Sequence, residues 1–238
     1  MKLKQLFESK IPTSKEEVEK FLTDFDIENY TINDDLTVDV DGDINIYYLR
    51  IEKFPVKFGK ITGSFWCTYN GLVSLEGAPR EVTGLFNCSG NKIESLKGGP
   101  IKVGGAYIVG DNKFTTLEGA PQDVGGDFRC SSNSLTNLKG SPKEIGGDFI
   151  CGNCKLKSLE GAPREVGGDF DCAHNELTSL KGAPRVVGDN FYCFNNELAS
   201  LTGAPKEVGG DFSCSGNGQL ISLDGIGNVE GRIFSDLS

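Results

Sequence analysis

Long apolar segments are missing from this sequence, and positive charge is scarce. No stretch reaches about eighteen consecutive apolar residues, and the amino-terminal lysines precede no apolar run, so we expect no transmembrane helix and no secretion signal. Lysine and arginine total 24 against 34 aspartates and glutamates, which gives a net charge of -10. A broad basic surface for phosphate groups is therefore excluded, and neither nucleic acid nor an anionic membrane is an expected partner. These absences favour a cytoplasmic protein whose protein partner has a basic surface.

Histidine and paired metal-ligand motifs are also scarce. The chain has one histidine, His174, and one C-x-x-C pair, Cys151 and Cys154. Two thiolates at this spacing can share a zinc ion or form a disulfide, but without a second pair we expect no metal site and no cofactor. Recurring Gly-Gly pairs open no helix and form no nucleotide loop. We therefore expect no enzyme; a Cys-dependent hydrolase or transferase using Cys154 and His174 is the less favoured alternative.

What the sequence does contain is a strict repeat of 21 residues, clearest in residues 166 to 186, VGGDFDCAHNELTSLKGAPRV. Each copy is numbered here from its branched aliphatic residue. Position one is occupied by Ile61, Val82, Val103, Val124, Ile145, Val166, Val187, Val208 and Val229. A fixed period of this length indicates a solenoid, because one copy is too small to fold alone and buries its apolar face against its neighbours.

Several positions of the repeat are apolar in all seven copies from 61 to 207 and predict the core. Position five is Phe or Tyr, position seven is Cys or Val, and positions twelve and fifteen are mostly Leu. A slot that accepts Cys or Val is small and apolar, so we interpret the cysteines as reduced core thiols rather than disulfides. Residues 170 to 172 alternate inward and outward as a short strand, and position ten, usually Asn, can bond the backbone where that strand turns.

The chain divides into two predicted parts. Residues 1–39 do not repeat and form a helical N-terminal cap: Ser14 and Glu17 have the capping-box spacing, and the apolar residues that follow predict a helix over 14–25. Leu3, Leu6 and Phe7 suggest a short helical turn before it. Residues 40–238 form the solenoid, with a degenerate coil at 40–60, eight coils at 61–228 and a terminal strand at 229–238.

The repeat resembles the leucine-rich repeat. Phe170, Cys172, Asn175, Leu177 and Leu180 follow the L-x-L-x-x-N/C-x-L-x-x-L pattern, with Phe and Cys where Leu is usual. The short period is similar to the bacterial type found in secreted effectors, and SLEGAPREVGGDFDC is similar to uncharacterised proteins of tailed bacteriophages. The predicted fold class is therefore an α+β repeat solenoid, leucine-rich-repeat-like, with one short parallel strand per coil. The resemblance implies a concave strand face that binds another protein, here a bacterial host defence or metabolic protein that the phage protein would inhibit.

The candidate site lies at positions four, six, eight and nine, which face outward on the strand face and vary from copy to copy. Variation on a fixed scaffold is where recognition is usually placed. The predicted partner-binding residues are Trp66, Tyr69, Ile108, Asp127, Arg129, Asp148, Ile150, Asp169, Asp171, His174, Tyr192, Phe194 and Asp211.

The same residues also allow structural interpretations that involve no partner. The aspartates at position four form either a solvated row or a site for Lys or Arg from a partner. Trp66 and the nearby tyrosines 47, 48 and 69 could instead pack under the N-terminal cap. A structural role, with self-association through the end coils, is the alternative to partner binding.

Overall fold

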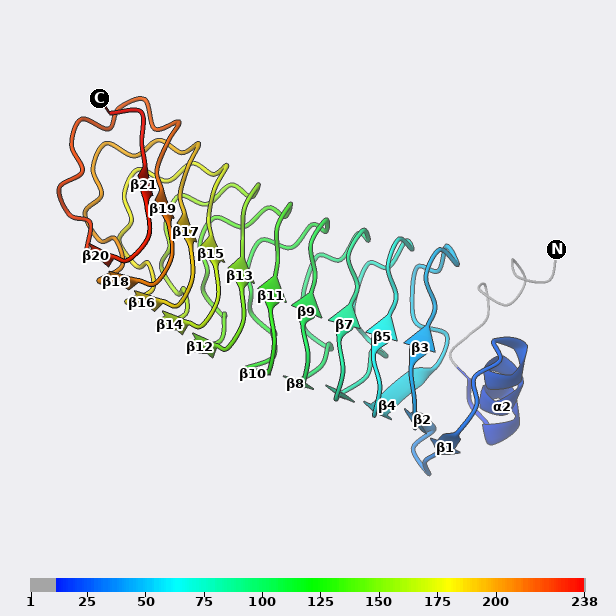
Figure 1. Ribbon diagram of the computed structural model, residues 1–238. Coiled ribbons are helices and arrows are strands. Elements are labelled where there is room, and N and C mark those ends of the chain that lie inside the picture. Colours follow the sequence, from blue (N-terminus) through cyan, green and yellow to red (C-terminus); the bar gives the residue numbers. More distant parts are fainter. Residues whose placement is uncertain (1–11, 238) are drawn as a thin grey trace.

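The computed structural model describes residues 12–237, and these form an elongated solenoid whose coils stack along one axis (Figure 1). Neighbouring coils pair in parallel with a register of exactly one repeat: Phe149 lies opposite Phe170, and Phe170 lies opposite Phe191. The predicted solenoid of 21-residue coils is thus confirmed.

The predicted row of strands forms one continuous parallel sheet. Its ten strands are β3 (Ile44–Asn45), β5 (Phe65–Trp66), β7 (Phe86–Asn87), β9 (Tyr107–Ile108), β11 (Phe128–Arg129), β13 (Phe149–Ile150), β15 (Phe170–Asp171), β17 (Phe191–Tyr192), β19 (Phe212–Ser213) and β21 (Ile233–Phe234). In every strand from β5 to β19 the position-five residue is buried and the position-six residue is half-buried. This alternation places position six on the outer surface, as expected.

A second row of strands, which sequence reasoning did not foresee, forms at positions twenty-one and one. It comprises β1 (Tyr30–Ile32), β2 (Thr37–Val40), β4 (Lys57–Ile61), β6 (Glu81–Val82), β8 (Lys102–Val103), β10 (Asp123–Val124), β12 (Glu144–Ile145), β14 (Glu165–Val166), β16 (Val186–Val187), β18 (Glu207–Val208) and β20 (Asn228–Val229). The glycine that follows each of β8, β10, β12, β14, β16 and β18 suits this packing: a Cβ on Gly188 would lie 2.0 Å from the carbonyl oxygen of Gly167. The row divides between β10 and β12, where a Cβ on Gly146 would lie 3.7 Å from the Gly125 oxygen.

The core is an aromatic column flanked by cysteine and leucine columns. Phe170 is fully buried between Phe149 and Phe191, with ring centroids 5.5 Å away on each side and interplanar angles of 8° and 6°. All eight cysteines are free and buried, as expected for core thiols. Burial raises the pKa of thiols such as Cys130 and Cys172, so these side chains are neutral and unreactive in the folded state.

The asparagines at position ten form the predicted internal ladder. In one representative coil, Asn196 Nδ2 donates to the carbonyl oxygens of Cys172 and Cys193, both at 3.1 Å, and its Oδ1 accepts from the N–H of Leu177 at 3.0 Å. Each amide therefore bonds its own coil and the preceding one. Such bonding satisfies backbone groups where the strand turns away from the sheet.

The N-terminal cap contains the predicted helix. Helix α2 (Lys15–Asp24) begins after Ser14, whose side chain accepts from the N–H of Glu17, and it buries Val18, Phe21 and Leu22. It lies beside β1 and β2 at one end of the stack (Figure 1). Strand β1 pairs antiparallel with β2, which continues the second row of strands. The predicted turn at Leu3, Leu6 and Phe7 lies outside the described residues.

Tyr107 is expected to weaken the aromatic column. It is the one position-five tyrosine, it is fully buried, and its hydroxyl has no hydrogen-bond partner. Because an unpaired buried hydroxyl is unfavourable, Tyr107→Phe should raise the free energy of unfolding by about 1 kcal/mol, measured by urea denaturation. Tyr69→Phe, at an exposed tyrosine, should change it by less than about 0.5 kcal/mol. A less stable Tyr107→Phe protein would contradict this account.

Candidate functional site on the strand face

The strand face is the outer surface of the sheet β3–β21, formed by the side chains at positions four, six, eight and nine. It carries all the predicted partner-binding residues. Trp66, Ile108, Ile150, Asp171 and Tyr192 occupy position six on different strands and are half-buried. The structure thus places these side chains on one surface, although six coils separate Trp66 from Tyr192, roughly 29 Å at a strand spacing of about 4.8 Å.

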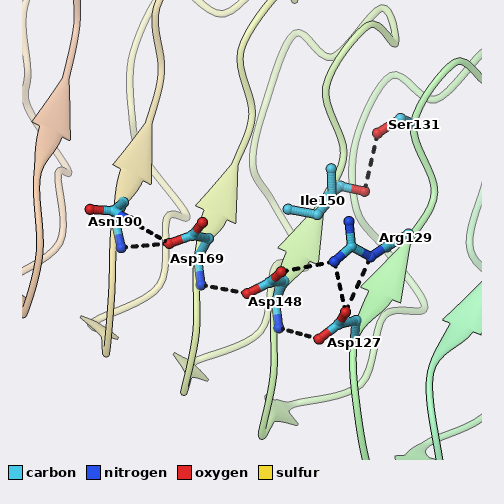
Figure 2. Close-up of polar contacts among 7 residues, drawn as sticks. All are labelled: Asp127, Arg129, Ser131, Asp148, Ile150, Asp169 and Asn190. Atoms are coloured by element: carbon cyan, nitrogen blue, oxygen red, sulfur yellow. Dashed lines mark hydrogen bonds and ion pairs between the residues drawn. The ribbon is translucent and has the colours of Figure 1, made fainter.

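The acidic row at position four has a structural task that sequence reasoning missed. Asp127 Oδ1 accepts from the N–H of Asp148 at 3.0 Å, Asp148 Oδ1 from Asp169 at 3.0 Å, and Asp169 Oδ1 from Asn190 at 2.8 Å (Figure 2). The position-four side chains that accept this bond from the next coil are Asp43, Ser64, Asp127, Asp148, Asp169, Asn190 and Asp211. One carboxylate oxygen of each aspartate is therefore held by the backbone, which leaves the other for a cation.

Arg129 neutralises the first part of this row. Its Nη2 atom lies 2.7 Å from Asp127 Oδ2 and 3.0 Å from Asp148 Oδ2, so one guanidinium bridges two coils (Figure 2). Burial alone would raise the pKa of Asp127, but the N–H of Asp148 and the Arg129 guanidinium outweigh it and lower that pKa. This bridge joins the two coils between which the second strand row is divided. The three residues were predicted to contact a partner, and the structure pairs them with one another.

The second part of the row forms an acidic and aromatic surface, the C-terminal patch: Asp169, Asp171, His174, Tyr192, Phe194 and Asp211. Burial raises the pKa of Tyr192, and the carboxylates of Asp169, Asp211, Asp171 and Asp148 raise it further. The aromatic rings contact one another edge to face, with centroids 6.2 Å apart for Tyr192 and Phe194 and 5.2 Å apart for His174 and Phe194.

Asp171 is a half-buried carboxylate of the C-terminal patch. Burial raises its pKa, while the N–H of Ala173, bonded to Asp171 Oδ1 at 2.8 Å, and the nearby His174 oppose the shift. The neighbouring charge of Asp169 adds to the rise. A cation placed here would relieve both the burial of this carboxylate and its repulsion from Asp169.

Exposed tyrosines form a second surface at the other end of the strand face, the N-terminal patch: Tyr47, Tyr48, Trp66 and Tyr69. The tyrosines are 48%, 63% and 51% exposed, so the described part of the cap does not cover them. Tyr48 and Tyr69 stack with centroids 5.1 Å apart and an interplanar angle of 5°. The alternative in which the tyrosines pack under the cap does not hold for residues 12–237.

Position nine has a backbone conformation that the repeat pattern did not reveal. In all nine coils its φ is between 51° and 70°, the left-handed region. Asn, Asp, His and Gly accept this conformation more readily than other residues, whereas Tyr48 and Tyr69 are strained by about 1–3 kcal/mol each. The frequency of Asn, Asp and Gly at position nine was the available signal. Strained aromatic residues on an exposed surface are consistent with a binding role.

Cys154 replaces asparagine in the ladder. It is buried, its thiol donates to the carbonyl of Cys130 at 3.6 Å, and burial raises its pKa although the N–H groups of Asn133 and Leu135 point to the sulfur. The neutral thiol is poorly suited to act as a nucleophile. His174 instead contacts Phe194 and the amide of Asn195, at 3.4 Å.

Restoring the amide should stabilise the protein. Cys154→Asn is expected to raise the free energy of unfolding by about 1 kcal/mol, because an amide can accept from Leu135 and donate to two carbonyls as Asn175 does in the next coil. The same substitution at Cys151, in the apolar core column, should lower it by about 2 kcal/mol or more. Chemical denaturation of both variants tests the assignment of the two cysteines to different columns; equal effects would refute it.

Two further observations concern membrane-spanning helices and metal-binding clusters. In residues 12–237 there is no helix with the length and apolar character needed to cross a membrane. Within the same residues, no three His, Cys, Asp or Glu side chains are grouped so that they could hold a metal ion.

No protein-family model, curated protein or solved structure matches the chain.

Proposed function

We propose that this protein is a non-catalytic scaffold that binds a protein partner with a basic surface on its strand face. The observation that carries the proposal is the C-terminal patch, where Asp169, Asp171 and Asp211 surround Tyr192 and no lysine or arginine in residues 12–237 forms an ion pair with them. Unbalanced charge next to half-buried rings suits an oppositely charged partner surface whose side chains pack against those rings.

The N-terminal patch extends the same function. Three exposed tyrosines, two of them on strained backbone, offer large contact area at small entropic cost. The two patches are separated by roughly 29 Å, so a folded partner of standard interface size could contact both.

The sequence resemblance supports a finer version of this proposal. A phage protein of this type would act in the host cytoplasm and inhibit a bacterial defence or metabolic protein by occupying its surface. The support for this version is the similarity of the repeat sequence, SLEGAPREVGGDFDC, to the sequences of phage leucine-rich-repeat-like proteins.

The test is capture from bacterial lysate on the immobilised protein, followed by identification of the bound chains. A variant with Trp66, Ile150 and Tyr192 replaced by serine should lose the captured protein and keep its circular dichroism spectrum. The matched control replaces Lys97, Glu118 and Lys181, which are exposed on the turns, by alanine and should retain capture. Retained capture by the first variant would refute the assignment of the surface, and capture that requires Cys154 would favour the hydrolase alternative.

Self-association is a second candidate, favoured by the last coil. Ile233, at the core position five, is 44% exposed, as is Phe234, and Ile221 is 87% exposed. If the end coil mediates assembly, light scattering should show a mass that rises with protein concentration, and Ile233→Asn should abolish the rise. A constant monomer mass would reject this candidate.

A further inference from the structure

Arg129 shows how the strand face holds a guanidinium group. It uses the outer oxygens of two position-four carboxylates, Asp127 and Asp148, while the inner oxygens stay bonded to the backbone of the next coil. The carboxylates are thus fixed before the cation binds, and no rearrangement is needed. The Asp127 and Asp148 carboxylates therefore show, within this protein, how carboxylates of the acidic row bind a guanidinium.

The C-terminal patch also has carboxylates held by backbone bonds, but Asp169 and Asp171 lie at positions four and six of one coil, and no lysine or arginine of residues 12–237 pairs with them. The inner oxygens of Asp169 and Asp211 are held by the N–H groups of Asn190 and Arg232, both at 2.8 Å, and Asp171 Oδ1 is held by Ala173. The outer oxygens of these three aspartates have no bonded partner among residues 12–237. Asp169 immediately precedes strand β15 and Asp171 ends it, as Asp127 precedes strand β11 and Arg129 ends it.

The C-terminal patch also contains aromatic rings beside its carboxylates. Tyr192 lies on the strand next to Asp171 and is close enough to four carboxylates for its pKa to rise. Its ring meets Phe194, which in turn meets His174. A guanidinium is planar and binds carboxylates through paired donors while it stacks on an aromatic face, whereas an ammonium offers a point charge.

Charge complementarity and ring geometry together identify one occupant. We propose that the C-terminal patch binds an arginine side chain from an exposed segment of the partner protein, with its guanidinium on the outer oxygens of Asp169 and Asp171 and its plane against Tyr192. Asp211 adds negative charge from the far side of the ring. The inference rests on the proposed binding function and specifies the chemistry of the partner.

Calorimetric titration with a short synthetic peptide tests this directly. The probe is an acetylated and amidated peptide of alternating arginine and glycine; the comparison peptides carry lysine or the uncharged analogue citrulline in place of arginine. The arginine peptide should bind most tightly, the citrulline peptide about tenfold or more weakly, and binding should weaken with added salt. Equal affinity for the arginine and citrulline peptides overturns the proposal, and equal affinity for arginine and lysine overturns the planar stacking geometry.

The variants can be chosen so that the fold is kept. Asn190 already makes the position-four backbone bond, and Asn87 makes the position-six bond to the N–H of Ser89 at 3.0 Å, so Asp169→Asn and Asp171→Asn have precedents in this chain. The double variant should raise the Kd for the arginine peptide about tenfold or more. Tyr192→Phe should bind as the parent does, and Tyr192→Leu more weakly.

A control of equal charge separates this site from general attraction. Glu118→Gln with Glu144→Gln changes the net charge by the same amount at exposed positions away from the strand face. This control should bind the arginine peptide as the parent protein does; a loss equal to that of the aspartate variant overturns the proposal. Because the peptide assay needs no natural partner, peptide binding without lysate capture would reject the proposed function alone. Lysate capture without arginine preference would reject only this inference.

Discussion

Phe170→Ala is expected to lower the free energy of unfolding by about 3–5 kcal/mol, because it removes the centre of the aromatic column. Phe170 is fully buried, with one ring stacked on each side at 5.5 Å. Neighbouring coils pair through backbone hydrogen bonds and cannot close the gap without shifting the sheet, so most of the cavity should remain. Urea denaturation followed by circular dichroism measures the loss.

Because Phe170 lies in a middle coil, the breadth of the unfolding transition is a second quantity that Phe170→Ala should change. Each coil contacts only its neighbours, so a weak coil in the middle can separate the two halves and broaden the unfolding transition. Phe170→Leu, which keeps most of the volume, should cost roughly 1–2 kcal/mol and keep one transition. A Phe170→Ala protein as stable as the parent would mean that the column is not the core the structure shows.

Asn196→Ala should lower the free energy of unfolding by about 2–4 kcal/mol. The substitution leaves the buried N–H of Leu177 without its partner and removes one of two amide donors from each of the carbonyls of Cys172 and Cys193, which keep Asn175 and Asn217. A buried polar group that loses its partner costs about 1–3 kcal/mol. Hydrogen exchange should show faster exchange of the Leu177 amide in the variant.

The neighbouring side chain supplies the control for this prediction. Glu197 is exposed, so Glu197→Ala should change stability by less than about 0.5 kcal/mol. Asn196→Asp keeps the acceptor for Leu177 but places a carboxylate against two carbonyls, and it should be no more stable than the alanine variant. Unchanged stability of Asn196→Ala would show that water replaces the amide and that the ladder contributes little.

The two roles of the acidic row change how the strand face is understood. Each position-four aspartate first stabilises the stack by holding the next coil, and only its outer oxygen is left for recognition. Arg129 uses two of these oxygens and bridges the coils where the second strand row is divided. Recognition by the remaining carboxylates is therefore built on a rigid support, which reduces the ordering cost of binding.

Much of the architecture could be predicted from periodicity alone. A residue type that recurs every 21 positions must have the same environment in every coil, so Phe170, Cys172 and Leu180 are assigned to the core without coordinates. The helix after Ser14 was predictable because capping and amphipathic spacing are local signals. The second strand row was missed because its strands are two residues long and the glycines beside them are equally typical of turns.

The candidate site could be located from the sequence but not resolved. Position and variability placed Asp127, Asp169 and Tyr192 on one face. The two aspartates are the same residue at the same repeat position, so the sequence does not show that only one of them is paired with a cation. Asp127 shares a guanidinium with Asp148, and Asp169 has no such cation. Which carboxylate an arginine reaches depends on side-chain direction across coils, which a linear pattern does not contain.

By itself, the sequence determined the repeat length, the register between coils and the division into core and surface positions, because a solenoid copies one local environment many times. Only the tertiary structure decided the pairing of charges and the orphan hydroxyl of Tyr107. These depend on contacts between particular side chains of different coils. Such contacts arise where one coil departs from the next, and periodicity describes only what the coils share.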